Sequence, residues 1–195
     1  GKTVLLRALI EQLRPDQFEV GWVMDPAGGR SDFLREVLYE LGHEIDGGDR
    51  VSLTHRLHEA IHKTFRAGGG TVIVIDGTEG LVDEEVFDEL IRLTNLQAAD
   101  RQLVTLLLSG TPEGAGRLSR CKHLDQRVGL RARLGPLDAG HTVGYVSHRL
   151  RLAGATRPIL TEAALALVHQ LTGGIPREIN HLCDLALLLG HRRRE

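Results

Sequence analysis

Apolar residues recur three and four positions apart in several stretches of the chain, the spacing of one face of an amphipathic helix. This pattern predicts helices over residues 3–13, 31–41, 52–67 and 83–97. Pro15 is expected to end the first helix, because proline cannot continue one. Ser31 is expected to cap the second, and Gly42 to follow its last turn.

Strands are expected between these helices. Residues 71–76 form a continuous β-branched run, residues 103–109 form a second apolar run, and residues 18–24 also have the character of a strand. Apolar runs without polar alternation are typical of a sheet whose two faces are both covered by helices. Because strands and helices alternate along the chain, the sequence predicts a parallel sheet with right-handed crossovers.

Beyond residue 137 the pattern changes to helices alone. Residues 141–153, 161–171 and 176–190 have helical spacing, with no strand expected between them. The sequence therefore predicts an α/β fold in two parts. A core with a parallel sheet flanked by helices is expected over residues 1–137, and a small α-helical lid domain over residues 138–195.

The composition is that of an ordinary globular protein. Of the 195 residues 42% are hydrophobic and 26% are charged, and the formal net charge is −2. This balance argues against a surface built to wrap nucleic acid. The two cysteines, Cys121 and Cys183, form no C-x-x-C pair, which favours a reducing, cytoplasmic setting. No apolar run in the sequence approaches the ~20 residues that a membrane span needs.

Gly1-Lys2-Thr3 opens the chain, directly before the first predicted helix. These residues match the second half of the phosphate-binding loop G-x-x-x-x-G-K-[ST], so we expect a fragment that lacks the first strand and most of this loop. In such a loop the lysine reaches the β- and γ-phosphates, the hydroxyl holds Mg²⁺, and backbone N–H groups face the phosphates. The tripeptide is common, so its meaning depends on the rest of the chain.

Two strand ends carry further candidate chemistry. Asp76 ends the run of residues 71–76, and ligands of open α/β sheets bind at the carboxyl ends of strands. A carboxylate there can hold a water of the Mg²⁺ shell, and a turn-capping aspartate is the structural alternative. At the end of the next strand Thr111, or else Ser109, could contact the γ-phosphate or orient the attacking water. The alternative is a plain Ser-Gly-Pro turn.

Arginines at two places are the remaining candidates. Arg177 follows Gly173-Gly174-Ile175-Pro176 and projects from a predicted helix start, where its charge opposes the helix dipole unless a phosphate is its partner. Arg127, Arg131 and Arg133 lie between the predicted sheet and lid. In ring ATPases an arginine from one subunit completes the site of its neighbour and can add ~10³–10⁵ in rate. An ordinary charged surface is the alternative for each of these three.

Together these blocks resemble the AAA+ ATPases of the general secretion pathway protein A type, over nearly the whole chain. The resemblance rests on several blocks in order, which include Gly1-Lys2-Thr3, Val74-Ile75-Asp76, Leu108-Ser109-Gly110-Thr111-Pro112-Glu113, Asp125-Gln126-Arg127 and Gly173-Gly174-Ile175-Pro176-Arg177-Glu178-Ile179-Asn180. The last block is the most specific. The resemblance implies a P-loop NTPase core with a helical lid, ATP and Mg²⁺ as cofactors, and hydrolytic phosphoryl transfer.

The resemblance also assigns roles to single residues, in Walker A, Walker B, sensor 1, an arginine finger and sensor 2. The residues that it assigns to nucleotide binding are Gly1, Lys2, Thr3 and Arg177. Those that it assigns to catalysis are Asp76, Glu79, Thr111 and Arg127. The ligands that it assigns to Mg²⁺ are Thr3 and Asp76.

One position departs from the family pattern. Relatives carry Asp-Glu after the apolar strand, whereas this chain carries Asp76-Gly77 and so lacks the glutamate that polarises the attacking water. Losing a general base typically costs ~10²–10⁴ in rate. Glu79 lies two residues further along, and water positioning tolerates little displacement. We therefore expect ATP binding to survive better than hydrolysis, and Gly77→Glu to raise turnover.

The function predicted from the sequence is that of an ATP-binding AAA+ ATPase that assembles as a homo-oligomer and acts on a membrane or secretion-apparatus partner protein. By resemblance, any peptidoglycan or inner-membrane link lies in regions outside this chain. Two alternatives stay open. The first is a nucleotide-dependent scaffold with weak hydrolysis, which Gly77 favours. The second is a DNA-associated ATPase of the transposition type, which the modest net charge disfavours, because nucleic-acid binding depends on cationic phosphate contacts.

Overall fold

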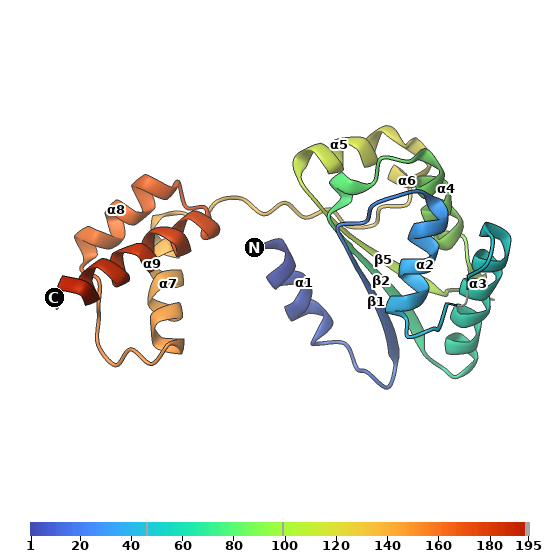
Figure 1. Cartoon of the computed structure of the whole chain (residues 1–195), viewed down its shortest axis with the longest axis horizontal. Helices are drawn as coiled ribbons and strands as arrows, with labels where there is room; N and C mark the ends of the chain where they lie inside the picture. Colours follow the sequence, from blue (N-terminus) through green and yellow to red (C-terminus); the bar gives the residue numbers. More distant parts are fainter. Residues whose placement is uncertain (46, 99, 194–195) are drawn as a thin grey trace. The chain divides into compact units, whose positions relative to one another are not determined.

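A computed structural model describes residues 1–45, 47–98 and 100–193 of the chain (Figure 1). The chain divides into two compact units, Lys2–Arg131 and Ala132–Glu195. The first unit contains the sheet and the helices around it, and the second is helical. Within the described ranges, no helix combines the length and the apolar character needed to cross a membrane.

The first unit is built on a parallel sheet with the strand order β1-β2-β5. Its strands are β1 (Phe18–Met24), β2 (Gly70–Asp76) and β5 (Val104–Ser109). The register pairs Met24 with Asp76 and Asp76 with Ser109, so the carboxyl ends of the strands lie side by side. The parallel sheet predicted from the sequence is confirmed.

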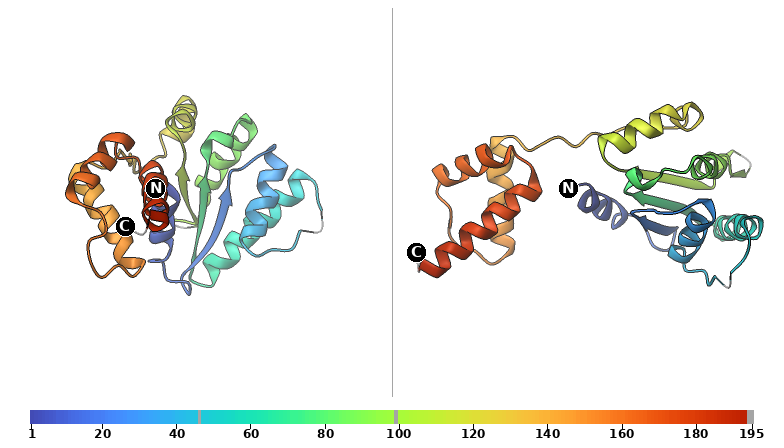
Figure 2. Two further views of the ribbon diagram at one scale, coloured as in Figure 1. Left: turned by 60° about the vertical axis from the view of Figure 1, so that its left-hand side comes forward. Right: turned by 45° about the horizontal axis from the view of Figure 1, so that its top comes forward.

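Helices lie on both sides of this sheet, as Figures 1 and 2 show. On one face pack α2 (Arg30–Glu40), α3 (Arg50–Arg66) and α4 (Glu84–Thr94), and beside the other lies α1 (Lys2–Ile10). The core between the sheet and helices α2, α3 and α4 contains side chains that are fully buried: Leu34, Leu57, Ile73, Ile75 and Leu90. In contrast, α1 has no buried side chain.

One local expectation is wrong, and several elements were not predicted from the sequence. Ser31 does not cap α2, because it lies inside that helix, whose N-cap is Gly29 without a side-chain hydrogen bond. Side-chain caps are supplied instead by Asp49 to α3 and by Asp83 to α4. The pattern also missed short elements: η1 (Thr78–Gly80), β3 (Gln97–Ala98), β4 (Arg101–Gln102), α5 (Pro112–Arg120) and α6 (Lys122–Asp125).

The second unit consists of α7 (Ala139–Leu152), α8 (Glu162–Thr172) and α9 (Pro176–Arg193) in its described part. Its small core contains Val146, Leu165, Val168, Ile179 and Cys183, and Leu137 packs against them. The backbone N–H of Leu137 donates to the carbonyl of Gly174 at 2.9 Å. This bond ties the segment before α7 to the turn before α9.

Candidate functional site

Asp76, at the end of the central strand, lies between two hydroxyl groups. The hydroxyl of Thr3 donates to Asp76 Oδ2 at 2.6 Å, and that of Ser109 donates to Asp76 Oδ1 at 2.8 Å. All three side chains are part-buried. The β2–β5 register explains the second contact, because Asp76 and Ser109 are paired at the strand ends. These three residues, with Lys2 and Glu79, are called the Asp76 group below.

Glu79 is an ionised member of this group. Its Oε2 accepts the backbone N–H of Thr111 at 3.0 Å. This hydrogen bond lowers the pKa of Glu79 most, with a smaller contribution in the same direction from the positive charge of Lys2; burial and the negative charge of Asp76 act in the opposite direction. The carboxylate of Glu79 therefore links the ends of β2 and β5 and lies within electrostatic reach of Lys2.

The lowered pKa of Glu79 predicts a dependence of stability on pH. A carboxyl whose pKa is lower in the folded chain than its ordinary value of 4.5 stabilises the fold above that value, and the contribution is lost as the pH falls through the folded pKa. Glu79→Gln keeps an acceptor for Thr111 but removes the charge. We expect the Tm of the variant to be lower than that of the wild type near neutral pH and the difference to disappear in acid. Thermal unfolding over a pH series measures this, and a difference independent of pH would count against it.

Gly77 sets the path of the chain between Asp76 and Glu79. Its φ of 114° lies in the left-handed region, which residues with a side chain rarely adopt. A Cβ at this position would overlap Asp25 Oδ1 and come within 3.0 Å of Asp25 Cα. A glutamate at position 77 would therefore strain the backbone and displace Asp25, which argues against the expectation that Gly77→Glu raises turnover.

Gly77→Ala should destabilise the core by about 1–3 kcal/mol, the usual cost of holding a residue in a sparsely populated backbone region. Gly116→Ala is a matched control, because Gly116 lies inside α5 and a Cβ there has no neighbour within 4 Å. That control should be stabilising by about 0.5–1 kcal/mol, as expected for alanine in a helix interior. Urea unfolding of both variants compares the midpoints. Equal shifts for the two variants would contradict the special role of Gly77.

Ser109 and Thr111 have different tasks in the structure. The hydroxyl of Thr111 caps α5 by accepting the N–H of Gly114 at 3.3 Å, and Pro112 occupies the first turn of that helix. Ser109, the alternative to Thr111, is the side chain that contacts Asp76. The succession Thr111-Pro112 is a helix-start signal, and it could have identified α5 from the sequence.

The candidate arginines are not part of the Asp76 group in the described part of the chain. Arg127 donates twice to Asn95 Oδ1, at 2.9 and 3.3 Å, and once to the carbonyl of His123 at 2.6 Å. Arg131 forms an ion pair of 2.5 Å with Asp125, which lowers the pKa of that carboxyl. Arg133 is exposed in the segment before α7. Arg177 is exposed at the start of α9 and belongs to the second unit.

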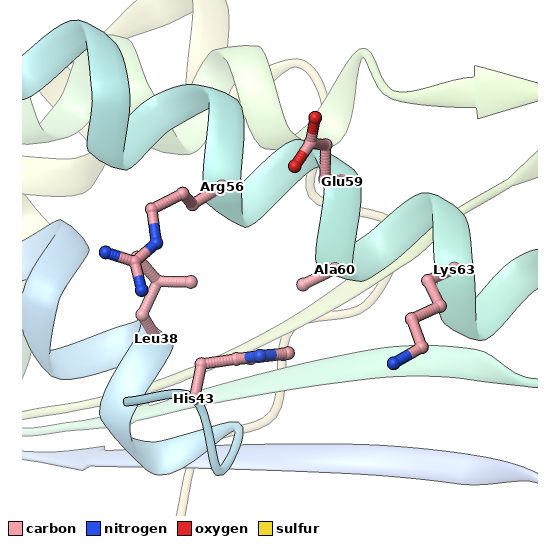
Figure 3. A pocket seen from close by; sticks show the side chains of 6 residues that line it. All are labelled: Leu38, His43, Arg56, Glu59, Ala60 and Lys63. Atoms are coloured by element: carbon pink, nitrogen blue, oxygen red, sulfur yellow. The ribbon is translucent and has the colours of Figure 1, made fainter. Parts of the chain in front are cut away.

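A hollow at the opposite end of the sheet is distinct from this group. It has a volume of about 200 Å³ and is lined by Leu38, His43, Arg56, Glu59, Ala60 and Lys63 (Figure 3). An adjoining hollow reaches Phe18 and Gly69, where β1 and β2 begin. Arg56 already donates to the carbonyl of Glu44 at 2.5 Å. Because ligands of parallel sheets bind at the carboxyl ends of strands, the candidate site is the Asp76 group.

The comparison with protein families decides the class of this chain. Residues 1–118 match the model of a family described as the AAA domain. The chain belongs to the AAA domain family. This family consists of nucleotide-dependent ATPases. The enzyme class predicted from the sequence, an ATP hydrolase, is therefore confirmed.

One relative is similar along nearly the whole length of this chain. The chain is 33% identical to General secretion pathway protein A of Aeromonas hydrophila over 99% of its own length. It covers 36% of that protein, so it spans about a third of the relative's length. The resemblance to this type of AAA+ ATPase is confirmed.

Solved structures support the fold. The ORC2 protein of Aeropyrum pernix in its ADP form matches with a TM-score of 0.69 and 15% identity, over 97% of this chain and 55% of that one. Cdc6p of Pyrobaculum aerophilum matches with a TM-score of 0.68 and 19% identity, over 92% of this chain and 48% of that one. At these identities the likeness shows the fold alone, and it confirms the predicted P-loop NTPase fold with helices following the sheet.

Proposed function

We propose that this AAA domain binds ATP with Mg²⁺ at the Asp76 group and hydrolyses the bond to the γ-phosphate. The observation that carries the proposal is the hydrogen bond of 2.6 Å between Thr3 and Asp76. It joins the last residue of the Gly1-Lys2-Thr3 motif to the carboxylate at the end of the central strand, although 73 positions separate them. A phosphate loop and a metal-holding carboxylate must meet in this way to act on one nucleotide.

The residues present fit the proposed Mg²⁺ and triphosphate. Mg²⁺ prefers oxygen ligands from carboxylates and hydroxyls. Thr3 offers a hydroxyl and Asp76 a carboxylate, and the two groups are hydrogen-bonded to each other. Lys2, next to Thr3 at the start of α1, contributes a positive charge for the phosphates. When bound, the ion neutralises the negative charge that the phosphate oxygens carry.

The remaining side chains of the group have supporting tasks. Ser109 donates to Oδ1 of Asp76 and so fixes the orientation of this carboxylate, whose Oδ2 then faces Thr3. Thr111 acts through its backbone N–H, which holds Glu79 ionised beside Lys2. The proposed catalytic roles of Glu79 and Thr111 are thus coupled through one hydrogen bond of 3.0 Å.

We assign the two outlying arginines to assembly and to the lid. Arg127, tied to Asn95 on the surface of the first unit, is the proposed finger that completes the site of a neighbouring copy in a homo-oligomer. Arg177, at the start of α9, is the proposed sensor 2 of a lid domain that spans residues 138–195. In such a device the nucleotide state moves the lid by hinge closure.

The proposed partner of this ATPase is a protein of a secretion or pilus-assembly apparatus at the inner membrane. The printed name of the Aeromonas hydrophila relative supports this proposal. A link to the membrane or to peptidoglycan would be formed by regions other than this chain, with the ATPase domain itself in the cytoplasm. A change of the bound nucleotide would move the lid, and the lid would transmit this movement to the partner protein.

The test is to measure ATP affinity and phosphate release on one preparation of the full-length protein, with and without Mg²⁺. The proposal expects Mg²⁺-dependent binding of ATP and release of phosphate. Binding without release would support the alternative of a nucleotide-dependent scaffold, which the missing side chain at Gly77 favours. Absence of ATP binding would contradict both.

A further inference from the structure

Asp25, the residue that follows β1, has an unusual backbone conformation. Its φ is 47°, and it is the only non-glycine residue with a positive φ among residues 1–45, 47–98 and 100–193. Its N–H donates to the carbonyl of Asp76 at 2.7 Å, so its backbone is attached to the end of the central strand. Strained conformations of this kind persist where the surrounding structure holds them, and they are concentrated at functional sites.

The side chain of Asp25 occupies the space beside Gly77. Its Oδ1 lies where the Cβ of a side chain at position 77 would begin, and only a glycine at that position leaves room for it. Within the described part of the chain, the carboxylate of Asp25 has no hydrogen-bond or ion-pair partner, and the residue is exposed. A carboxylate without a hydrogen-bond or ion-pair partner in the described residues therefore lies beside Gly77, the residue that follows Asp76.

We propose that Asp25 supplies the carboxylate that orients the attacking water, in place of the glutamate that the chain lacks at position 77. The inference rests on the proposed ATPase function, and it replaces the expectation that hydrolysis is impaired by Gly77. The carboxylate of Asp25 comes from the residue after β1, whereas the glutamate that the chain lacks would come from position 77, directly after β2. Gly77 is then part of the same arrangement, because a side chain there would displace Asp25.

The chemical step balances without a further reactant. The oxygen of the water forms a bond to the γ-phosphorus, and the bond between that phosphorus and the β–γ bridging oxygen breaks, with its electron pair leaving on ADP. The protons of the water go to the phosphate product and to solvent. Asp25 accepts a hydrogen bond from the water and so fixes its direction of approach, which is the task of the water-orienting residue in phosphoryl transfer.

Glu79 is the competing carboxylate, and its contacts make it the weaker candidate. Its Oε2 is engaged by the N–H of Thr111, and its charge is balanced in part by Lys2. A carboxylate already held by a backbone N–H has less freedom to accept a hydrogen bond from water. Asp25 has no such partner in the described residues, which is the reason for preferring it.

The experiment is to compare Asp25→Asn and Asp25→Gly with the wild type in the full-length protein. Asparagine tolerates the left-handed region, and glycine adopts it freely, so both variants should keep the backbone at position 25. Each should lower kcat for phosphate release by ~10²–10⁴-fold while the Kd for MgATP changes less than about threefold. Asp88→Asn is the matched control: Asp88 is exposed on α4, and this substitution should leave kcat unchanged.

The outcomes separate this inference from the proposed function. If the wild type binds ATP and releases phosphate and both Asp25 variants retain its kcat, Asp25 does not orient the water although the ATPase function stands. If the wild type binds ATP without releasing phosphate, the inference is also overturned and the scaffold alternative remains. If the wild type does not bind ATP, the proposed function itself fails. A loss of kcat with unchanged affinity and Tm in both variants supports the inference.

Discussion

Glu89→Ala is expected to lower the free energy of unfolding of the first unit by about 3–5 kcal/mol, the usual cost of leaving one partner of a buried ion pair unpaired. Glu89 on α4 is 0% exposed and forms an ion pair with Arg30, the first residue of α2, which is 6% exposed. Within the described chain, Glu89 Oε1 and Arg30 Nε are buried without a hydrogen-bond partner. In this part of the structure the guanidinium of Arg30 forms no ion pair with any other carboxylate.

The control is the double variant Arg30→Met, Glu89→Leu, which removes both charges. Replacing a whole buried pair by apolar residues is often neutral or stabilising, and the two unpartnered polar atoms are removed with it. We expect the double variant to unfold in urea at a midpoint close to that of the wild type, well above that of Glu89→Ala. A single variant as stable as the wild type to within about 1 kcal/mol would show that the pair is not buried as described.

Asp76→Asn is expected to reduce phosphate release by roughly 10³-fold or more, because a catalytic metal ion contributes several kcal/mol of transition-state stabilisation. The substitution keeps the shape of the side chain and an acceptor for one hydroxyl, but it removes the charge that would hold Mg²⁺. Asp16→Asn is the control, because Asp16 is exposed before β1 and pairs only with Arg14 in the described chain. Phosphate release by the full-length proteins at saturating MgATP measures the effect, and a loss below about tenfold would argue against a metal role for Asp76.

The strands and the position of Asp76 could be predicted from the sequence because both depend on local pattern. The apolar run that ends at Asp76 is long enough to specify a buried strand, and the parallel sheet brings the ends of β2 and β5 together. The motif Gly1-Lys2-Thr3 identifies Thr3, and the contact of Thr3 with Asp76 follows from the position of α1 beside the sheet.

Other parts of the site depend on loop conformation and could not be predicted from spacing. The sequence marked Gly77 as a missing glutamate, but its left-handed φ and the space that it leaves for Asp25 are properties of the folded loop. Asp25 is a single aspartate before Pro26, and the sequence pattern gives it no special character. The Arg30–Glu89 pair joins two helices 59 positions apart, and no periodicity along either helix identifies such a partner.

In the proposed function Thr3 and Asp76 act together on one Mg²⁺. A double-mutant cycle on the Mg²⁺-dependent affinity for ATP, with the wild type, Thr3→Ala, Asp76→Asn and the double variant, tests it most directly. We expect each single variant to lose most of the Mg²⁺ dependence and the double variant to lose little more, which gives a coupling energy above about 1 kcal/mol. Additive losses, or an Mg²⁺ dependence that persists in the double variant, would contradict it.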